Sequence, residues 1–311
     1  MRAITLQLIR MRFLWRQFGS VGVGLLLLSS SACKQLTRAQ EKPVLSNSQD
    51  LISDIAVMPT AVDDILNALT TARVVYLAET HTDIDDHAAQ LEIVQTLHQQ
   101  GGEVAIGLEM FQRPFQDALD QYLAGDISEA QMLTQTEYET RWGFPWEFYA
   151  PIVRYAQENQ IPLIALNAPA EVTRKVAREG LSSLAGDDLQ YIPPVADLDL
   201  TNEAYKAFMA GVLGGHGGPH GDFNLDNFFA AQVVWDETMA ATVADFAEAN
   251  PDTQVIVLAG EGHVIYDFGI PSRVERRLGS DLIAHSVILN PSAQTLVEGE
   301  GAIADFFWIS E

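Results

Sequence analysis

The chain has 311 residues, of which 48% are hydrophobic, and a formal net charge of −24 from 42 acidic and 18 basic residues. This length and hydrophobic content are typical of a globular domain and exclude a disordered chain. The excess of acidic residues also excludes a protein that binds nucleic acid through a basic surface, because a negative surface repels phosphates.

Residues 1–33 have the features of a lipoprotein signal peptide. Four arginines and no acidic residue precede or flank a short apolar stretch at 21–28, and small residues then lead to Cys33, the only cysteine. The apolar stretch is shorter than a membrane-spanning helix. We expect cleavage before Cys33 and attachment of a lipid to it, which would anchor the protein to a membrane. An ordinary cleaved signal and an uncleaved anchor are the alternatives.

Residues 34–58 are polar and without periodicity, and they are expected to form a flexible tether. The remaining residues, 59–311, contain no stretch that resembles a linker between domains. We therefore expect a single domain there.

Within this domain, apolar runs of strand length alternate with amphipathic stretches of helical length. The runs are almost continuously apolar, as in strands that helices cover on both faces. Strands are expected at 74–78, 104–110, 161–167, 253–260 and 282–289.

Helices are expected between these strands, at 86–100, 114–123, 128–137, 146–159, 171–179, 203–213 and 227–249. Such alternation predicts an α/β fold, in which helices flank a mostly parallel sheet. A helical insertion is expected at about 114–150.

Polar side chains follow the predicted strands at the points where the strands end. VVYLAETH (74–81) and VIVLAGEGH (255–263) both pass from an apolar run to a Glu and then a His. These are Glu79 with His81, and Glu261 with His263; Glu109 and Asn167 end two further strands. Because ligands of open α/β sheets bind beyond the carboxyl ends of the strands, we expect these groups to share one crevice.

Two imidazoles near carboxylates suit three different roles. They could hold a divalent metal, with His81, Glu109 and His263 as ligands. They could act as acid and base on a bound water, with Glu79, His81, Glu109 and His263 as catalytic residues. They could also form a hydrogen-bonded cluster that is only structural. The sequence pattern by itself leaves all three open.

Several motifs in the same order resemble the ChaN family of haem-binding lipoproteins, which is grouped with the Tiki, TraB and erythromycin-esterase proteins. They are ETHxxxxxH (79–87), GLEMFQRPFQ (107–116), YLAG (122–125), RWGFPWEFYAPI (141–152), ALNAP (165–169), AQVVWDETMA (231–240) and AGEGHVIYDFGIPSRVERR (259–277). The resemblance covers nearly all of residues 60–295.

The resemblance implies an α/β fold at the periplasmic side of a membrane and haem binding linked to iron uptake, in a homodimer that encloses the haem. The wider superfamily includes enzymes that depend on a Gly-x-x-His pattern and a strand-end Glu. These positions correspond here to Ala78 with His81, Gly260 with His263, and Glu109. Ala78 departs from the glycine of the first pattern, which weakens the case for a catalytic turn there.

The sequence has no CxxCH motif, so haem would be held by axial ligands and apolar contacts. Tyr266, His263 and Tyr149 are the candidate contacts, and Arg273 is the candidate partner of the haem propionates. Packing in the core is the alternative role for both tyrosines, and a solvent-facing helix is the alternative for the arginine.

Three functions therefore compete. The first is a lipid-anchored haem-binding protein of the cell envelope. The second is a hydrolase, metal-dependent or metal-free, that uses the strand-end Glu and His residues. The third is a partner-binding lipoprotein without catalytic activity.

Overall fold

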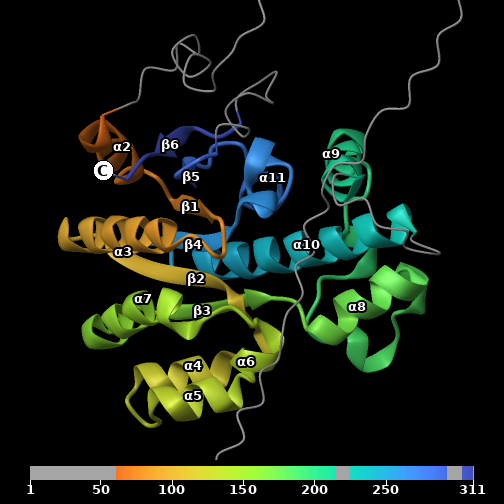
Figure 1. The fold of residues 1–311 in the computed structure, drawn as a ribbon, viewed down its shortest axis with the longest axis horizontal. Helices are drawn as coiled ribbons and strands as arrows, with labels where there is room; N and C mark the ends of the chain where they lie inside the picture. The colour runs from red at the N-terminus through yellow and green to blue at the C-terminus, as the bar shows by residue number, and fades with distance from the viewer. Residues whose placement is uncertain (1–60, 215–223, 293–302, 311) are drawn as a thin grey trace, which may run out of the picture. The chain divides into compact units, whose positions relative to one another are not determined.

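The structure is a computed structural model that describes residues 61–214, 224–292 and 303–310. The described residues form a six-stranded sheet in the order β3-β2-β4-β1-β5-β6, and every neighbouring pair is parallel (Figure 1). The predicted signal peptide, Cys33 and the tether at 34–58 lie outside the described residues.

The strands agree with the sequence prediction within two residues at each end, apart from one that was missed. They are β1 (Val74–Glu79), β2 (Glu103–Gln112), β3 (Leu163–Asn167), β4 (Thr253–Gly260), β5 (Ala284–Leu289) and β6 (Phe306–Trp308). All six residues of β1 are buried, which explains its unbroken apolar sequence. The sequence did not predict β6, because three residues at a sheet edge carry too little periodicity to stand out.

The helices follow the predicted alternation, and α2, α6 and α11 are additions that the sequence did not predict. They are α2 (Val62–Leu69), α3 (Ile84–Gln99), α4 (Gln116–Leu123), α5 (Glu129–Gln135), α6 (Tyr138–Arg141), α7 (Trp146–Asn159), α8 (Ala170–Glu179), α9 (Glu203–Gly214), α10 (Leu225–Ala249) and α11 (Ile270–Leu278). The expected helix at 128–137 ends early because Glu137 has a left-handed backbone, with φ of 52°.

Helices cover both faces of the sheet. Alternate residues of a strand point to opposite faces. On one face, Val75 and Leu77 of β1 pack in a core with side chains of α2, α3 and α7. On the other face, Val74 and Tyr76 pack with side chains of α10 and α11. The α/β fold with a parallel sheet is therefore as predicted.

The helical insertion lies beside β3 (Figure 1) and contains α4, α5 and α6. A capping box begins α5: the Ser128 amide donates to Gln131 Oε1 (2.9 Å), and the Ser128 hydroxyl accepts from the Gln131 amide (3.3 Å). The segment that leads from α6 to α7 carries Trp142 and Phe144, which reach the strand ends.

The register of the sheet places the two His-bearing turns side by side. In the pairing of β1 with β4, Ala78 lies opposite Ala259 and Glu79 lies opposite Gly260. β2 pairs with the other edge of β4, with Leu108 opposite Leu258. The residues after β1, at the end of β2 and after β4 therefore meet at one edge of the sheet.

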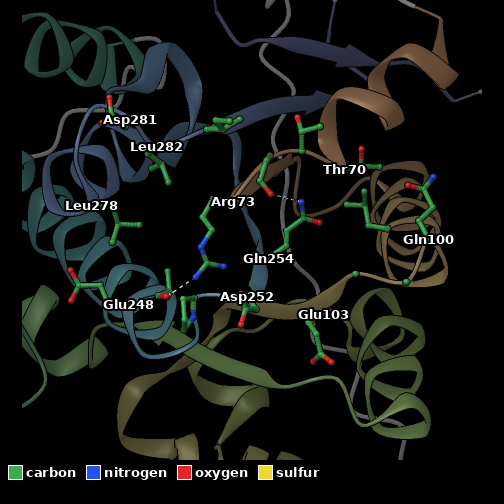
Figure 2. A pocket seen from close by; sticks show the side chains of 18 of the residues that line it. Thr70, Arg73, Gln100, Glu103, Glu248, Asp252, Gln254, Leu278, Asp281 and Leu282 are labelled. Atoms are coloured by element: carbon green, nitrogen blue, oxygen red, sulfur yellow. Dashed lines mark hydrogen bonds between the residues drawn. The ribbon is translucent and has the colours of Figure 1, made fainter.

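A wide cavity of about 1030 Å³ lies at the opposite edge, where the strands begin (Figure 2). Its main polar groups already have partners. Arg73 donates to the carbonyls of Ala247 (2.5 Å) and Asn250 (2.7 Å) at the end of α10. Gln254 donates to the carbonyls of Leu69 (2.8 Å) and Ala72 (2.6 Å) at the end of α2. Because the last carbonyls of a helix lack partners within it, these contacts stabilise helix ends.

None of the helices in the described part of the chain combines the length and the apolar character that a bilayer crossing needs.

Candidate functional site

Glu109 is the centre of a charged cluster at the carboxyl ends of β1, β2 and β4. Its Oε2 accepts a hydrogen bond from the Gly260 amide (2.7 Å), and its Oε1 lies 3.3 Å from Nε2 of His263. The residue is 4% exposed. A carboxylate buried to this extent is costly without partners, so the amide and the imidazole explain how it is accommodated.

His263 is held by the helix that covers this face of the sheet. Its Nδ1 lies 2.6 Å from Oδ1 of Asp236 in α10, and the amide nitrogen of Gln232 lies 3.1 Å from the same ring nitrogen. Tyr205 of α9 donates to the other oxygen of Asp236 (2.9 Å). With Nδ1 engaged by a carboxylate, Nε2 of the ring faces Glu109.

His81 is held in the same way from the opposite face. Its Nδ1 lies 2.8 Å from Oε1 of Glu79, whose side chain is fully buried. Glu79 also accepts hydrogen bonds from Tyr149 of α7 (2.6 Å) and Gln90 of α3 (2.6 Å). The helix α3 begins close by because the Asp83 side chain accepts the Asp85 amide (3.0 Å) and caps it.

The three central groups stabilise one another's charged forms. Burial opposes ionisation of Glu109, but His263, His81 and the Gly260 amide together lower its pKa. Burial likewise opposes protonation of His263, but Glu109 and Asp236 raise its pKa well above the ordinary value. The pKa of His81 is also raised, because Glu79 and Glu109 outweigh the effect of burial.

These groups open into a cavity of about 420 Å³, a volume suited to a small molecule. His81, Glu109 and His263 line it together with Trp142 and Trp235. The Trp142 ring meets the His81 ring edge-on, with centroids 4.8 Å apart, and Phe144 lies 4.9 Å from the same imidazole. The cavity therefore combines charged groups at its base with aromatic walls.

The structure gives no support to the predicted metal site on His81, Glu109 and His263. Within residues 61–214, 224–292 and 303–310, no group of three or more His, Cys, Asp or Glu side chains is arranged to hold a metal ion. The physical reason is that Glu109 is already paired directly with the His263 ring and the Gly260 amide. A cationic imidazole fills the role that the metal was expected to have.

Of the residues predicted from the haem resemblance, His263 lines this cavity, whereas Tyr149, Arg273 and Tyr266 do not. The Tyr149 hydroxyl is used in its hydrogen bond to Glu79. Arg273 is 3% exposed, lies 3.3 Å from Glu237, and donates to the Gly269 carbonyl (2.9 Å). Because this guanidinium is buried and does not line the cavity, the geometry disfavours contact with a propionate there. Tyr266 lies against Phe208 and Phe268, with centroids 5.9 and 5.3 Å away.

Sequence reasoning did not identify Asp236, Gln232, Gln90 or Tyr205 as parts of the site. The sequence did carry a signal for Asp236 and Gln232. Gln232 and Asp236 are four residues apart in an apolar helix, so they share one face, and both are buried. Buried polar residues at helical spacing are retained only where they have partners.

Gly260 is required for the close approach of His81. A Cβ atom at this position would lie 2.7 Å from Cε1 and 2.9 Å from Nε2 of the His81 ring. We expect Gly260→Ala to displace the ring and lower the free energy of unfolding by about 1–3 kcal/mol in urea denaturation. Gly262→Ala is the matched control, because a Cβ there meets nothing within 4 Å. Equal losses in the two variants would contradict the expected clash.

A family model described as "Haem-binding uptake, Tiki superfamily, ChaN" matches residues 65–274, which include β1 to β4 and every member of the cluster. The chain belongs to this family. Among solved structures, ChaN of Campylobacter jejuni, described with cofacial haem binding, superposes with a TM-score of 0.61 at 20% identity. The similarity covers 80% of this ChaN-family chain and 91% of the other, and it shows a shared fold.

Two further proteins show similarity to the chain. RETICULATA-RELATED 5, a chloroplastic protein of Arabidopsis thaliana, is 29% identical over 259 residues, which are 78% of this chain and 34% of the relative. The chain thus spans about a third of the length of that curated relative. A mutant of the erythromycin esterase EreC superposes with a TM-score of 0.44 at 16% identity, over 73% of this chain and 72% of the other.

Proposed function

We propose that the protein binds haem at the periplasmic side of the cell envelope, where a lipid on Cys33 anchors it to a membrane, and that it serves haem or iron uptake. Membership of a haem-binding family is the observation that carries the proposal. The arginine-rich, then apolar, leader that ends at Cys33 supports the anchor. A homodimer that encloses the haem is part of the proposal.

Tyr266 is the proposed iron ligand. Its backbone is left-handed, with φ of 57°, which a tyrosine rarely adopts. Such strain persists where the surrounding structure enforces it, and it is concentrated at functional positions. The Tyr266 hydroxyl has no hydrogen-bond partner among the described residues, and the ring is half-buried beside Phe208 and Phe268. A phenolate oxygen next to apolar rings fits the iron and the macrocycle of haem.

A titration of the full-length protein with haemin tests this proposal. We expect a saturable shift of the Soret absorption band, and a weaker or altered shift in Tyr266→Phe, which removes only the hydroxyl. Tyr155→Phe is the control, because Tyr155 is half-buried against the core on the other face of the sheet. No saturable shift in the unmodified protein would refute haem binding, and an unchanged Tyr266→Phe spectrum would refute the ligand. Sedimentation of the same samples measures whether haemin promotes dimers.

The strand-end cluster favours hydrolysis as a second candidate function. The carboxylate-backed imidazoles of His81 and His263 face an ionised Glu109 in one cavity, an arrangement that haem binding does not require. Glu109 can accept a hydrogen bond from a water, and cationic His263 can donate a proton to a leaving group. Hydrolysis by these groups would need no metal ion.

A screen of ester and amide substrates tests the second candidate. Hydrolysis by the unmodified protein should fall by at least about a hundredfold in His263→Ala, because the loss of a positioned acid or base has effects of that size. His98→Ala is the control, since His98 contacts Tyr155 on α7 and not the cluster. Equal rates in all three proteins would exclude catalysis by His263.

A further inference from the structure

Several cationic or ionisable nitrogen groups line the cavity. Four lining residues carry or can accept positive charge: His81, His263, Arg141 and Arg174. Glu109 is the one carboxylate among the described lining residues. Glu79, Asp236 and Glu109 balance the charges of the two imidazoles, so attraction of an anion to this cavity depends on the arginines.

The two arginines differ in whether they are free to bind a ligand. Arg141 lies 2.8 Å from Glu137 and 2.9 Å from Glu171, and it also donates to Gln112 (2.9 Å), so its charge is already balanced. Arg174 is exposed and has neither an ion pair nor a hydrogen bond from its side chain among the described residues.

The position of Arg174 on its helix directs it to the cavity. Ala170, Thr173 and Arg174 of α8 all line the cavity, and they are separated by the three- and four-residue steps that share one helical face. Arg174 is therefore a cation on the cavity wall with unused hydrogen-bond donors.

Asn167 adds an unpaired acceptor to the same cavity. Its amide nitrogen donates to the Glu109 carbonyl (3.0 Å), which fixes the orientation of the side chain. Its Oδ1 is buried and has no hydrogen-bond partner, and the residue as a whole is 8% exposed. A buried acceptor without a partner is unfavourable, so this oxygen calls for a donor on a ligand.

Trp142 and Trp235 form flat walls between these polar groups. Trp142 contacts the His81 ring, and the Trp235 ring lies 6.2 Å from the His263 ring, close to perpendicular to it. Indole walls favour an aromatic ligand, because stacked and edge-on ring contacts stabilise it beyond the area that it buries.

We propose that this cavity recognises a carboxylate attached to a flat aromatic body, with the carboxylate bound by Arg174 and a ligand donor bound by Asn167. Two sources share this chemistry: a free small aromatic acid and the propionate-bearing edge of haem. The use of the bound ligand, in hydrolysis or in haem uptake, rests on the proposed function. Binding itself does not depend on either.

Calorimetric titration of the full-length protein with 4-hydroxyphenylacetate tests the first source. Its neutral match, 4-hydroxyphenylacetamide, should bind at least about tenfold more weakly, because a charge-assisted hydrogen bond is lost. Arg174→Gln should lower the affinity for the acid about tenfold. Arg178→Gln is the matched control, because Arg178 is exposed on the same helix but does not line the cavity.

Haemin titrations of the same two variants test the second source. If Arg174→Gln but not Arg178→Gln loses affinity for the aromatic acid, the result supports a free acid. If Arg174→Gln but not Arg178→Gln loses affinity for haemin, the result supports a propionate. The proposal is overturned if Arg174→Gln and Arg178→Gln bind both probes as the unmodified protein does. Because the acid is tested without haem and without turnover, failure of haem binding or of hydrolysis is distinguishable from failure of this site.

Discussion

The Glu237→Ala variant is expected to lose about 3–5 kcal/mol of its free energy of unfolding, because it leaves the buried Arg273 and the half-buried Arg277 without their counter-ion. The Glu237 side chain is fully buried in α10 and accepts hydrogen bonds from Arg276 (2.7 Å) and Arg277 (2.6 Å) of α11. Arg273 lies 3.3 Å away, and the Asp199 amide donates to the same carboxylate (3.0 Å). One carboxylate thus joins α10, α11 and the segment before α9.

Urea denaturation followed by circular dichroism measures this loss. Glu248→Ala is the matched control, because Glu248 is exposed in the same helix, and its variant should differ from the unmodified protein by less than about 0.5 kcal/mol. If Glu237→Ala unfolds at the urea concentration of the control, the network does not support the packing of α11.

The free energy of unfolding is expected to decrease by a few kcal/mol as the pH rises from about 6.5 to about 10. Glu109 and Asp236 offset the effect of burial and raise the pKa of His263 to about 10. A histidine whose folded pKa is raised contributes stability that is complete below its unfolded pKa and is lost as the pH rises through the folded value. His81, whose pKa is also raised, acts in the same direction.

At acidic pH the free energy of unfolding is also expected to decrease, there because the pKa of a carboxyl group is lowered. The imidazoles and the Gly260 amide outweigh burial and lower the pKa of Glu109 to about 2. Its contribution is therefore present above the ordinary carboxyl pKa of about 4.3 and is lost as the pH falls towards 2. Urea unfolding at a series of pH values measures both limbs. His263→Gln should flatten the alkaline decrease, and a decrease of the same size in that variant would assign it to other groups.

The sheet and its strand ends could be predicted because they depend on local sequence patterns. A strand covered on both faces must be apolar throughout, so β1, β2 and β4 were recognisable from composition alone. In a parallel sheet the carboxyl ends of all strands lie at one edge, so the clustering of Glu79, His81, Glu109 and His263 followed from the fold class.

The roles of single side chains could not be predicted in the same way. Asp236 and Tyr149 reach the cluster from helices, and their contacts depend on how those helices rotate against the sheet. Arg273 and Arg174 show the limit most clearly. Arg273, close to the His263 motif in the chain, is buried against Glu237, whereas Arg174, which lines the cavity, comes from α8, almost a hundred residues earlier. Sequence distance from a motif did not indicate distance in space.

The two imidazoles of the cluster receive their carboxylates from opposite sides of the sheet. Glu79 is oriented by α3 and α7, whereas Asp236 belongs to α10. A substitution in one helical layer therefore acts directly on one ring and reaches the other only through Glu109. Variation among relatives could in this way divide the paired histidines into one that is reactive and one that is inert, on an unchanged scaffold.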